Sequence, residues 1–323
     1  MTRRSTLGID IAKASYQVSL RRADGKRRHK SCPNTEAGHA ALLTWLAHHD
    51  GASVHACLEA TGMYGDAVAT ALADAGHTVS IVNPAAVKAF AQSQLRRTKT
   101  DGVDADVLAD FCAAMHPVPW TPWPVEVRTL QGLVRRRDAV QDMLTQERNR
   151  QQAGALAAPV AESLARMIEA LATELADLDR QIHDHLDQHP GLRAQRDLLA
   201  TIPGIGTATV ARLLAECRAI TAFDSARAYA AFAGLVPRER QSGTSRPRAH
   251  LSKLGAARLR YALYLPALSA MRFNPLLRAF SARLLAAGKH KMVVVAAVMR
   301  KLLHIVYGVL KHQRPFDPQA LKA

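Results

Sequence analysis

The sequence predicts three parts: a mixed α/β domain over residues 1–116, a helical arm over 126–190, and a mainly helical domain over 191–323. Short apolar runs alternate with amphipathic stretches over the first 115 residues, which is typical of strands and helices in one sheet-based domain. Four prolines within residues 117–124 then exclude regular structure, so we expect an extended linker at 117–125. Beyond it, apolar residues recur at helical spacing.

The first domain divides into nine predicted elements. We expect strands at Thr6–Ile11, Tyr16–Arg22, Lys26–Cys32, Ser53–Leu58 and Thr78–Val82, and helices at Thr35–His49, Gly65–Ala75, Pro84–Leu95 and Asp101–Met115. Asp24-Gly25 is a good hairpin turn between the second and third strands. The order βββαβαβα, with the pair Pro84–Leu95 and Asp101–Met115 counted as one helical segment, indicates a mixed sheet flanked by helices.

The arm is predicted from a heptad-like seam. Its apolar positions alternate in spacings of four and three, as in a coiled coil: Leu164, Ile168, Leu171, Leu175, Leu178 and Ile182. An earlier stretch, about 126–152, is also helical, and Gly154 and Pro159 separate the two. A helical hairpin or dimerisation arm is one interpretation, and two core helices of a larger bundle is the other.

The net charge of +16 is concentrated near the C-terminus. Between Arg238 and Arg314 there are sixteen Lys or Arg and one acid, Glu239, which leaves 27 of the 43 basic and 26 of the 27 acidic residues elsewhere. A basic field confined to one region indicates a polyanion partner. A solvated basic surface ranks second, because such surfaces usually mix signs, and a membrane surface third, because the helices lack an aromatic belt.

Cysteine usage and hydropathy favour a cytoplasmic protein. The four cysteines are scattered without a close pair, which argues against a zinc ribbon or a disulfide framework. No signal peptide is expected at the N-terminus. The longest apolar run, Met292–Met299, has eight residues and is too short to cross a bilayer.

Four carboxylates are candidates for a catalytic metal site: Asp10, Glu59, Asp101 and Asp104. Asp10 ends the first predicted strand, Glu59 follows the fourth, and Asp101 and Asp104 share a face of the last helix. Neighbouring strand ends and a helix across that edge would bring them together, where two Mg²⁺ or Mn²⁺ ions about 4 Å apart would neutralise them and promote phosphoryl transfer. Considered alone, Asp101 would be interpreted as a helix cap and Glu59 as a solvent-exposed acid. We expect Asp106 and Asp110 to be surface residues.

A glycine-rich turn in the C-terminal domain resembles a helix-hairpin-helix element. Thr201–Gly206 contains Gly204 and Gly206 and precedes a predicted helix. Backbone N–H groups at such a helix start can hold a DNA phosphate without reading sequence. The alternative is a plain turn between two core helices, and the basic region that follows favours nucleic acid.

A loop rich in Arg, Ser and Gly follows. Ser242 lies next to Gly243, and Arg240, Arg246 and Arg248 could stabilise charge on a transferring phosphoryl group. On chemistry alone, the simpler interpretation is that these residues only hold phosphates. His250 could be a general base, although nothing in the sequence positions it. The last helix, Lys289–Lys311, leaves cations such as Lys291 to face solvent or phosphates.

Together these motifs resemble the transposases of the insertion sequence 110 family. Leu7–Asp10, Leu58–Gly62 and Lys99–Ala105 resemble its DEDD domain. Six further segments resemble the C-terminal domain of that family: Ile202–Gly206, Gly234–Pro237, Gln241–Gly243, Ser252–Gly255, Leu259-Arg260 and Met299–Leu303. The match runs in order along the chain.

The resemblance implies a fold, a chemistry and partners. The N-terminal domain would be RNase H-like (Holliday-junction-resolvase-like), with Mg²⁺ on Asp10, Glu59, Asp101 and Asp104. Ser242 would be the nucleophile that joins a DNA 5′ phosphate, although Ser245 and Ser252 lie close in sequence. A structured bridge RNA would guide donor and target DNA, and the protein would act as a dimer or tetramer. Lys253 and Arg260 join the candidate nucleic-acid contacts Gly204, Gly206, Arg240, Arg246, Arg248 and Lys291.

Two other functional classes remain open at this point. One is a metal-dependent, structure-specific DNA nuclease that uses the carboxylates without a covalent intermediate. The other is a non-catalytic DNA or RNA packaging protein whose carboxylates are caps. A third interpretation, an actin-like or sugar-kinase ATPase that opens with Leu7-Gly8-Ile9-Asp10, ranks low because the expected Gly-rich phosphate loops are missing.

Overall fold

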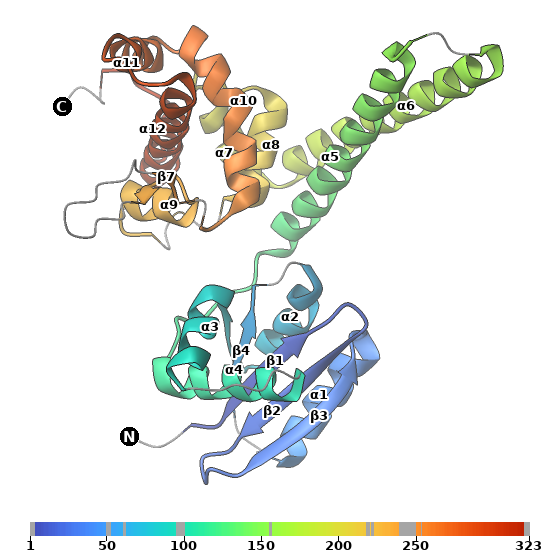
Figure 1. Cartoon of the computed structure of the whole chain (residues 1–323), viewed down its shortest axis with the longest axis vertical. Coiled ribbons are helices and arrows are strands. Elements are labelled where there is room, and N and C mark those ends of the chain that lie inside the picture. The colour runs from blue at the N-terminus through green and yellow to red at the C-terminus, as the bar shows by residue number, and fades with distance from the viewer. Residues whose placement is uncertain are drawn as a thin grey trace. The chain divides into compact units, whose positions relative to one another are not determined.

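The computed structural model describes residues 4–49, 53–60, 63–94, 101–154, 157–217, 220, 223–238, 250–252 and 254–319. The chain forms two compact units, Met1–Trp123 and Pro124–Ala323 (Figure 1).

The first unit is built on a five-stranded sheet with the strand order β3-β2-β1-β4-β5. Its strands are β1 (Thr6–Ile11), β2 (Ser15–Arg21), β3 (Arg27–Pro33), β4 (His55–Glu59) and β5 (Thr78–Val82). The first three form an antiparallel meander, and β4 and β5 run parallel to β1. The predicted mixed sheet is therefore confirmed.

Helices cover both faces of this sheet. Residues of α1 (Glu36–His49) and α2 (Asp66–Asp74) share one apolar core with Leu7 and Ile9 of β1. On the other face, α3 (Pro84–Ser93) and α4 (Asp101–Met115) share a core with Cys57 of β4. Since side chains alternate along a strand, Thr6, Gly8 and Asp10 belong to the face opposite that of Leu7 and Ile9.

The proline-rich segment is extended, as expected, and it lies against the first unit. The backbone N–H of Trp120 donates to the carbonyl oxygen of Val79 at 2.6 Å. The Ser80 hydroxyl lies 3.0 Å and 2.9 Å from the carbonyl oxygens of Pro117 and Val118. These contacts fix residues 117–120 along β5, so this part of the segment is held in place by the sheet.

A long helical hairpin opens the second unit. Its helices are α5 (Val125–Gln152) and α6 (Ala158–Gln188) (Figure 1). Leu178 and Ile182 of the predicted seam are buried, whereas Leu164, Ile168, Leu171 and Leu175 are half-buried. At its base, the hairpin contributes Leu130 and Ile182 to the core of the helical body. The region is therefore a helical hairpin whose base belongs to the core of the helical body, and a role of the hairpin in dimerisation stays a prediction.

The helical body follows the hairpin. Its helices are α7 (Pro190–Ala200), α8 (Thr207–Glu216), α9 (Ala226–Phe232), α10 (Ala257–Phe273), α11 (Pro275–Ala286) and α12 (Lys291–His312), with the two-residue strands β6 (Pro237–Arg238) and β7 (His250–Leu251). Among the described residues, α12 alone is long and apolar enough to cross a membrane, and 61% of its apolar window is buried inside the protein. It packs against α7, α9, α10 and α11, as the central helix of this body.

Candidate active site

The parallel pairing of β1 with β4 brings two predicted carboxylates to one sheet edge. The register pairs Gly8 with Cys57 and Ile9 with Leu58, and Asp10 and Glu59 each come one residue later. Both side chains are half-buried. Because the two strands are parallel, these residues lie together at the carboxyl ends of adjacent strands.

Helix α4 crosses the same edge because of a glycine in β1. A Cβ atom on Gly8 would lie 2.0 Å from the carbonyl oxygen of Ala105, so only glycine permits this approach. Two residues earlier in β1, the Thr6 hydroxyl donates to the carbonyl oxygen of Ala109 at 2.9 Å. Two residues forward along β1 cover roughly 6 Å, and so do four residues backward along α4. The helix therefore runs antiparallel to the strand, with Ala109 beside Thr6 and Ala105 beside Gly8. The next step places Asp10 opposite residue 101, at the start of α4.

Glu59 lies on the α4 side of the sheet as well. Cys57, two residues earlier, is fully buried in the core that α4 contributes to. The pKa of the Cys57 thiol is raised, first by its hydrogen bond with Cys112 of α4, then by burial and by the negative charges near it, including that of Glu59. Alternation along β4 therefore directs Glu59 to the face that Asp10 occupies.

The fourth predicted position, Asp104, is half-buried on the first turn of α4. The backbone of Asp101 begins this helix, whereas its side chain lies outside the described residues. Among the side chains that are described, no three His, Cys, Asp or Glu form a group that could hold a metal ion. The structure thus brings the three carboxylate-bearing elements to one edge, which we call the acidic edge (Asp10, Glu59, Asp104 and the start of α4).

In the second unit, the glycine turn is fixed by packing. Gly204 has φ +97°, and a Cβ atom there would lie 2.8 Å from the Cα atom of Ala270 in α10. The Asn274 amide donates to the carbonyl oxygen of Pro203 at 3.3 Å. Gly206 is exposed and caps α8, with open space around its Cα atom. Gly204 therefore has a structural reason to be glycine, and phosphate binding by this turn stays a prediction.

The remaining predicted contacts divide into two groups. Lys291 is exposed at the start of α12, while the Arg260 guanidinium donates to the carbonyl oxygens of Ala233 and Gly255 at 2.9 and 3.3 Å. Burial lowers the pKa of Arg260. The other predicted residues lie outside the described part of the chain: Arg240, Ser242, Ser245, Arg246, Arg248 and Lys253, together with the side chain of His250.

Comparison with known proteins gives the family. A family model described as "Transposase" (DEDD_Tnp_IS110) matches residues 7–156, and one described as "Transposase IS116/IS110/IS902 family" matches residues 196–282. A pilin gene-inverting protein of Moraxella bovis is 37% identical over 316 residues, which cover 96% of this chain and 97% of that protein. The chain belongs to the IS110 family of transposases. The counterpart in Moraxella lacunata is 36% identical, and the transposase of the element IS1328 in Yersinia enterocolitica is 26% identical over 79% of this chain and 80% of its own length.

Membership makes this IS110-family transposase an enzyme that acts on DNA as a transposase or recombinase. The DEDD-domain match covers the first unit, which contains the acidic edge. The second match runs from the second half of α7 through α10 and most of α11, including β6 and β7.

The transposase also holds α4 in place through two carboxylates that we expected at the surface. Asp106 accepts hydrogen bonds from the Ser19 hydroxyl at 2.5 Å and from Arg27 at 3.0 Å, and His29 lies 2.9 Å away. Asp110 pairs with Arg27 and, at 3.7 Å, with Arg21. Both are partly buried, with side-chain exposures of 22% and 20%. The surface prediction is therefore wrong.

A sequence signal for this network exists. Asp106 and Asp110 are four residues apart, so they share one helix face, and the β2–β3 hairpin is basic. Burial alone would raise the pKa of Asp106, but hydrogen bonds from Ser19 and His29 and the positive charge of Arg27 lower it. The network ties α4 to β2 and β3, and through α4 it positions Asp104.

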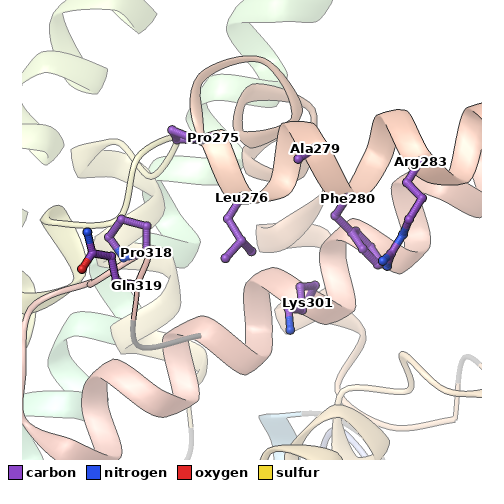
Figure 2. Close-up of a pocket in the computed structure, with 8 residues that line it drawn as sticks. All are labelled: Pro275, Leu276, Ala279, Phe280, Arg283, Lys301, Pro318 and Gln319. Carbon is purple, nitrogen blue, oxygen red and sulfur yellow. The ribbon is translucent and has the colours of Figure 1, made fainter. Parts of the chain in front are cut away.

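In its second unit, the transposase has a basic cavity of about 670 Å³ between α11, α12 and the C-terminal tail. Figure 2 shows Arg283 of α11 and Lys301 of α12 on its walls, with Pro318 and Gln319 on the opposite side. The described lining residues include no acid. The Arg283 guanidinium lies 5.5 Å from the ring centroid of Phe280. Such a cavity suits an anionic group, in keeping with the basic charge of this region.

Proposed function

We propose that the acidic edge is the DNA-cutting site of this transposase. The observation that supports the proposal is the convergence of β1, β4 and α4: Asp10 and Glu59 end adjacent parallel strands, and α4, which carries Asp104, packs against β1 at Gly8. Carboxylates at the ends of adjacent parallel strands lie where ligands bind in open α/β sheets. We assign Asp101 to the same site, because α4 begins with it. We also propose that the unit is RNase H-like, a proposal with which the strand order β3-β2-β1-β4-β5 is compatible.

The donor set fits a hard divalent cation. Asp10, Glu59, Asp101 and Asp104 offer carboxylate oxygens, the ligands that Mg²⁺ and Mn²⁺ prefer. Mg²⁺ or Mn²⁺ bound there would offset the repulsion between the carboxylates and stabilise negative charge on the phosphate oxygens. Asp106 and Asp110 are excluded from this set, because Arg27 neutralises them.

We further propose that Ser242 is the nucleophile of strand exchange. Its hydroxyl oxygen attacks a DNA phosphorus, an Oγ–P bond forms, and the P–O3′ bond breaks. The hydroxyl proton passes to a base, and the leaving 3′ oxygen takes up a proton. A 3′ hydroxyl of the partner strand then attacks the 5′-phosphoserine, which restores a phosphodiester and frees the serine. Support comes from the resemblance of Gln241–Gly243 to the family motif and from the neighbouring arginines Arg240, Arg246 and Arg248.

Guidance by a bridge RNA and action as a dimer or tetramer belong to the same proposal. They rest on the family resemblance, and the excess positive charge after Arg238 suits binding of more than one nucleic-acid strand. The half-buried seam residues of α6, such as Leu164 and Ile168, offer apolar surface for assembly.

A specific observation favours a second candidate, inversion of a DNA segment. The pilin gene-inverting protein of Moraxella bovis matches this chain over nearly the full length of both. Transposition and inversion need the same cutting and joining steps and differ in how the sites are arranged. A plasmid carrying two candidate sites in inverted orientation would distinguish them by the orientation of the intervening DNA.

The covalent step is tested by trapping a protein–DNA adduct. Purified full-length protein is mixed with Mg²⁺, RNA transcribed from the flanks of the element, and donor and target DNA labelled at either end. The proposal expects label that migrates with the denatured protein and disappears in Ser242→Ala, while Ser245→Ala and Ser252→Ala keep it. Cut DNA without an adduct, lost in Asp10→Ala, would instead establish a hydrolytic nuclease.

A further inference from the structure

A second hollow in the C-terminal unit is mostly apolar and carries positive charge. It has a volume of about 800 Å³ and lies between α10, the first half of α12 and the strand pair β6–β7. Its described lining contains two arginines, Arg260 and Arg300, and no acid. We call it the tyrosine groove, after Tyr261 and Tyr264 on its wall.

The groove exposes aromatic surface that the core does not use. Tyr261 is 62% exposed and Tyr264 38%, and a spacing of three puts both rings on one face of α10. Across the groove, Met292 and Val293 of α12 are each 55% exposed. A contiguous patch of this kind usually marks a binding surface.

The charges around the tyrosines select the kind of occupant. Arg258 is exposed one helical turn before Tyr261, and Arg300 adds a second cation on the α12 side. The Arg212 guanidinium lies 6.0 Å from the ring centroid of Tyr261, but Asp138 pairs with it at 2.5 Å, so it is not counted among these cations. An apolar protein surface would match the rings but gain nothing from cations of one sign. Nucleobases carried on a phosphate backbone match both, since bases stack on aromatic rings and phosphates pair with arginine.

The position of the groove fits such an occupant. Pro237 of β6 and Leu251 of β7 line it, and these two strands flank residues 239–249, which include Ser242, along the chain. Duplex DNA hides its base faces within the stack, so only unpaired nucleotides can present a face to tyrosine.

We propose that the tyrosine groove binds unpaired nucleotides of the DNA strand being exchanged, by stacking bases on Tyr261 and Tyr264. This inference rests on the proposed strand exchange for its role, and it adds the state of the substrate: the strand is unpaired next to the point of cutting.

Photo-crosslinking with binding measurements tests it on the full-length protein. The probe is a single-stranded 12-mer in which 5-iodouracil replaces thymine, with its duplex form for comparison. We expect crosslinks that map by mass spectrometry to Tyr261 or Tyr264. Replacing both by alanine should weaken single-strand binding by about tenfold or more, because each stacked base contributes substantially to affinity. Duplex affinity should change by less than about threefold.

Matched variants separate stacking from other effects. Tyr261→Phe with Tyr264→Phe keeps the rings and should bind single strands as the wild type does. Leu265→Ala removes a side chain that is 62% exposed on the same helix but does not line the groove, and it should also bind normally. Equal losses of single-strand and duplex binding in the double alanine variant would overturn the proposal. So would unchanged binding, or a change of oligomeric state in sedimentation, which would make the groove a protein interface.

The same experiment distinguishes failure of this inference from failure of the proposed function. Asp10→Asn should lose strand cutting and keep both the crosslink and single-strand affinity. Crosslinks without any DNA cutting by the wild type would leave the groove assignment standing and remove the proposed reaction. If the wild type gave no crosslinks and the double alanine variant cut and joined DNA at wild-type rates, the groove assignment would fail and the proposed reaction would stand.

Discussion

At the scale of single residues, Gly8 decides where α4 lies. A methyl group there would overlap the backbone of Ala105 and Ala109, and backbone atoms cannot rotate away. We predict that Gly8→Ala destabilises the first unit by about 3 kcal/mol or more, because strand and helix must separate. Thermal unfolding followed by circular dichroism measures this.

Gly102 provides the control on the same helix. A Cβ atom at Gly102 meets nothing within 4 Å, so Gly102→Ala should stabilise α4 by roughly 0.5–1 kcal/mol. Equal unfolding temperatures for Gly8→Ala and the wild type would show that α4 does not pack on β1 as described.

The Asp106 carboxylate gives the first unit a dependence on pH. Its pKa is lowered in the folded protein, so its stabilising contribution is present above its ordinary value of about 4 and is lost as the pH falls through the lower folded value. We predict that Asp106→Asn lowers the free energy of unfolding by about 1–3 kcal/mol between pH 5 and 7. The unfolding temperature should fall over the same pH range. The gap to the wild type should begin to narrow below about pH 4 and close once the pH has fallen below the lower folded value.

This pH series has a direct control. Asp74 is exposed at the end of α2, and Asp74→Asn should follow the wild type at every pH. A gap for Asp106→Asn that stays constant down to pH 2.5 would mean that lost packing, and not lost charge, explains the destabilisation.

At the scale of elements, local patterns predict the sheet and its helices well. Alternating apolar residues, the Asp24-Gly25 turn and helical spacing depend on neighbours in sequence, and all five strands and the flanking helices of the first unit form where they indicate. The parallel pairing of β1 and β4 follows from element order, which is why Asp10 and Glu59 could be placed at one edge beforehand.

Contacts between distant residues could not be predicted in this way. Asp106 was expected at the surface, because its spacing from Asp110 and the basic hairpin do not by themselves identify Arg27, 79 positions earlier, as its partner. Arg260 was expected to contact nucleic acid, yet its guanidinium donates to two carbonyl oxygens, a role that depends on how the loops before α10 fold. The tyrosine groove was missed because Tyr261 and Tyr264 have the spacing of core residues, and only their exposure distinguishes them.

The α5–α6 hairpin changes character along its length, and this is testable. Ile182 is buried at the base, whereas Ile168 is half-buried farther along α6. We predict that Ile182→Ala costs about 2–4 kcal/mol and Ile168→Ala less than half of that. Urea unfolding measures both. An equally large loss for Ile168→Ala in dilute protein would show that its surroundings are closed, and would argue against an assembly surface there.

At the scale of the whole molecule, the acidic edge and most of the excess positive charge belong to different units. The positive excess lies after Arg238, while the acidic edge belongs to the first unit. DNA affinity should therefore fall steeply with salt, with a logarithmic slope of about −5 if roughly six phosphates are contacted.

Single substitutions should show which lysines contribute to this salt dependence. Lys291→Ala should reduce the slope by about 1, while Lys88→Ala, an exposed lysine on α3, should leave it unchanged. Fluorescence anisotropy over a salt series measures both. A slope that falls equally for the two variants would place DNA contacts on the first unit as well.

The most direct test of the acidic edge measures strand exchange in Asp10→Asn, Glu59→Gln and Asp104→Asn beside Asp74→Asn. These substitutions keep side-chain size and remove one negative charge each. We predict that the first three lower exchange by at least about a thousandfold with unchanged unfolding temperatures, because each takes away transition-state stabilisation and not packing. Asp74→Asn should exchange strands as the wild type does. Wild-type exchange in any of the first three would contradict the assignment of that residue, and wild-type exchange in all three would remove the acidic edge from the reaction.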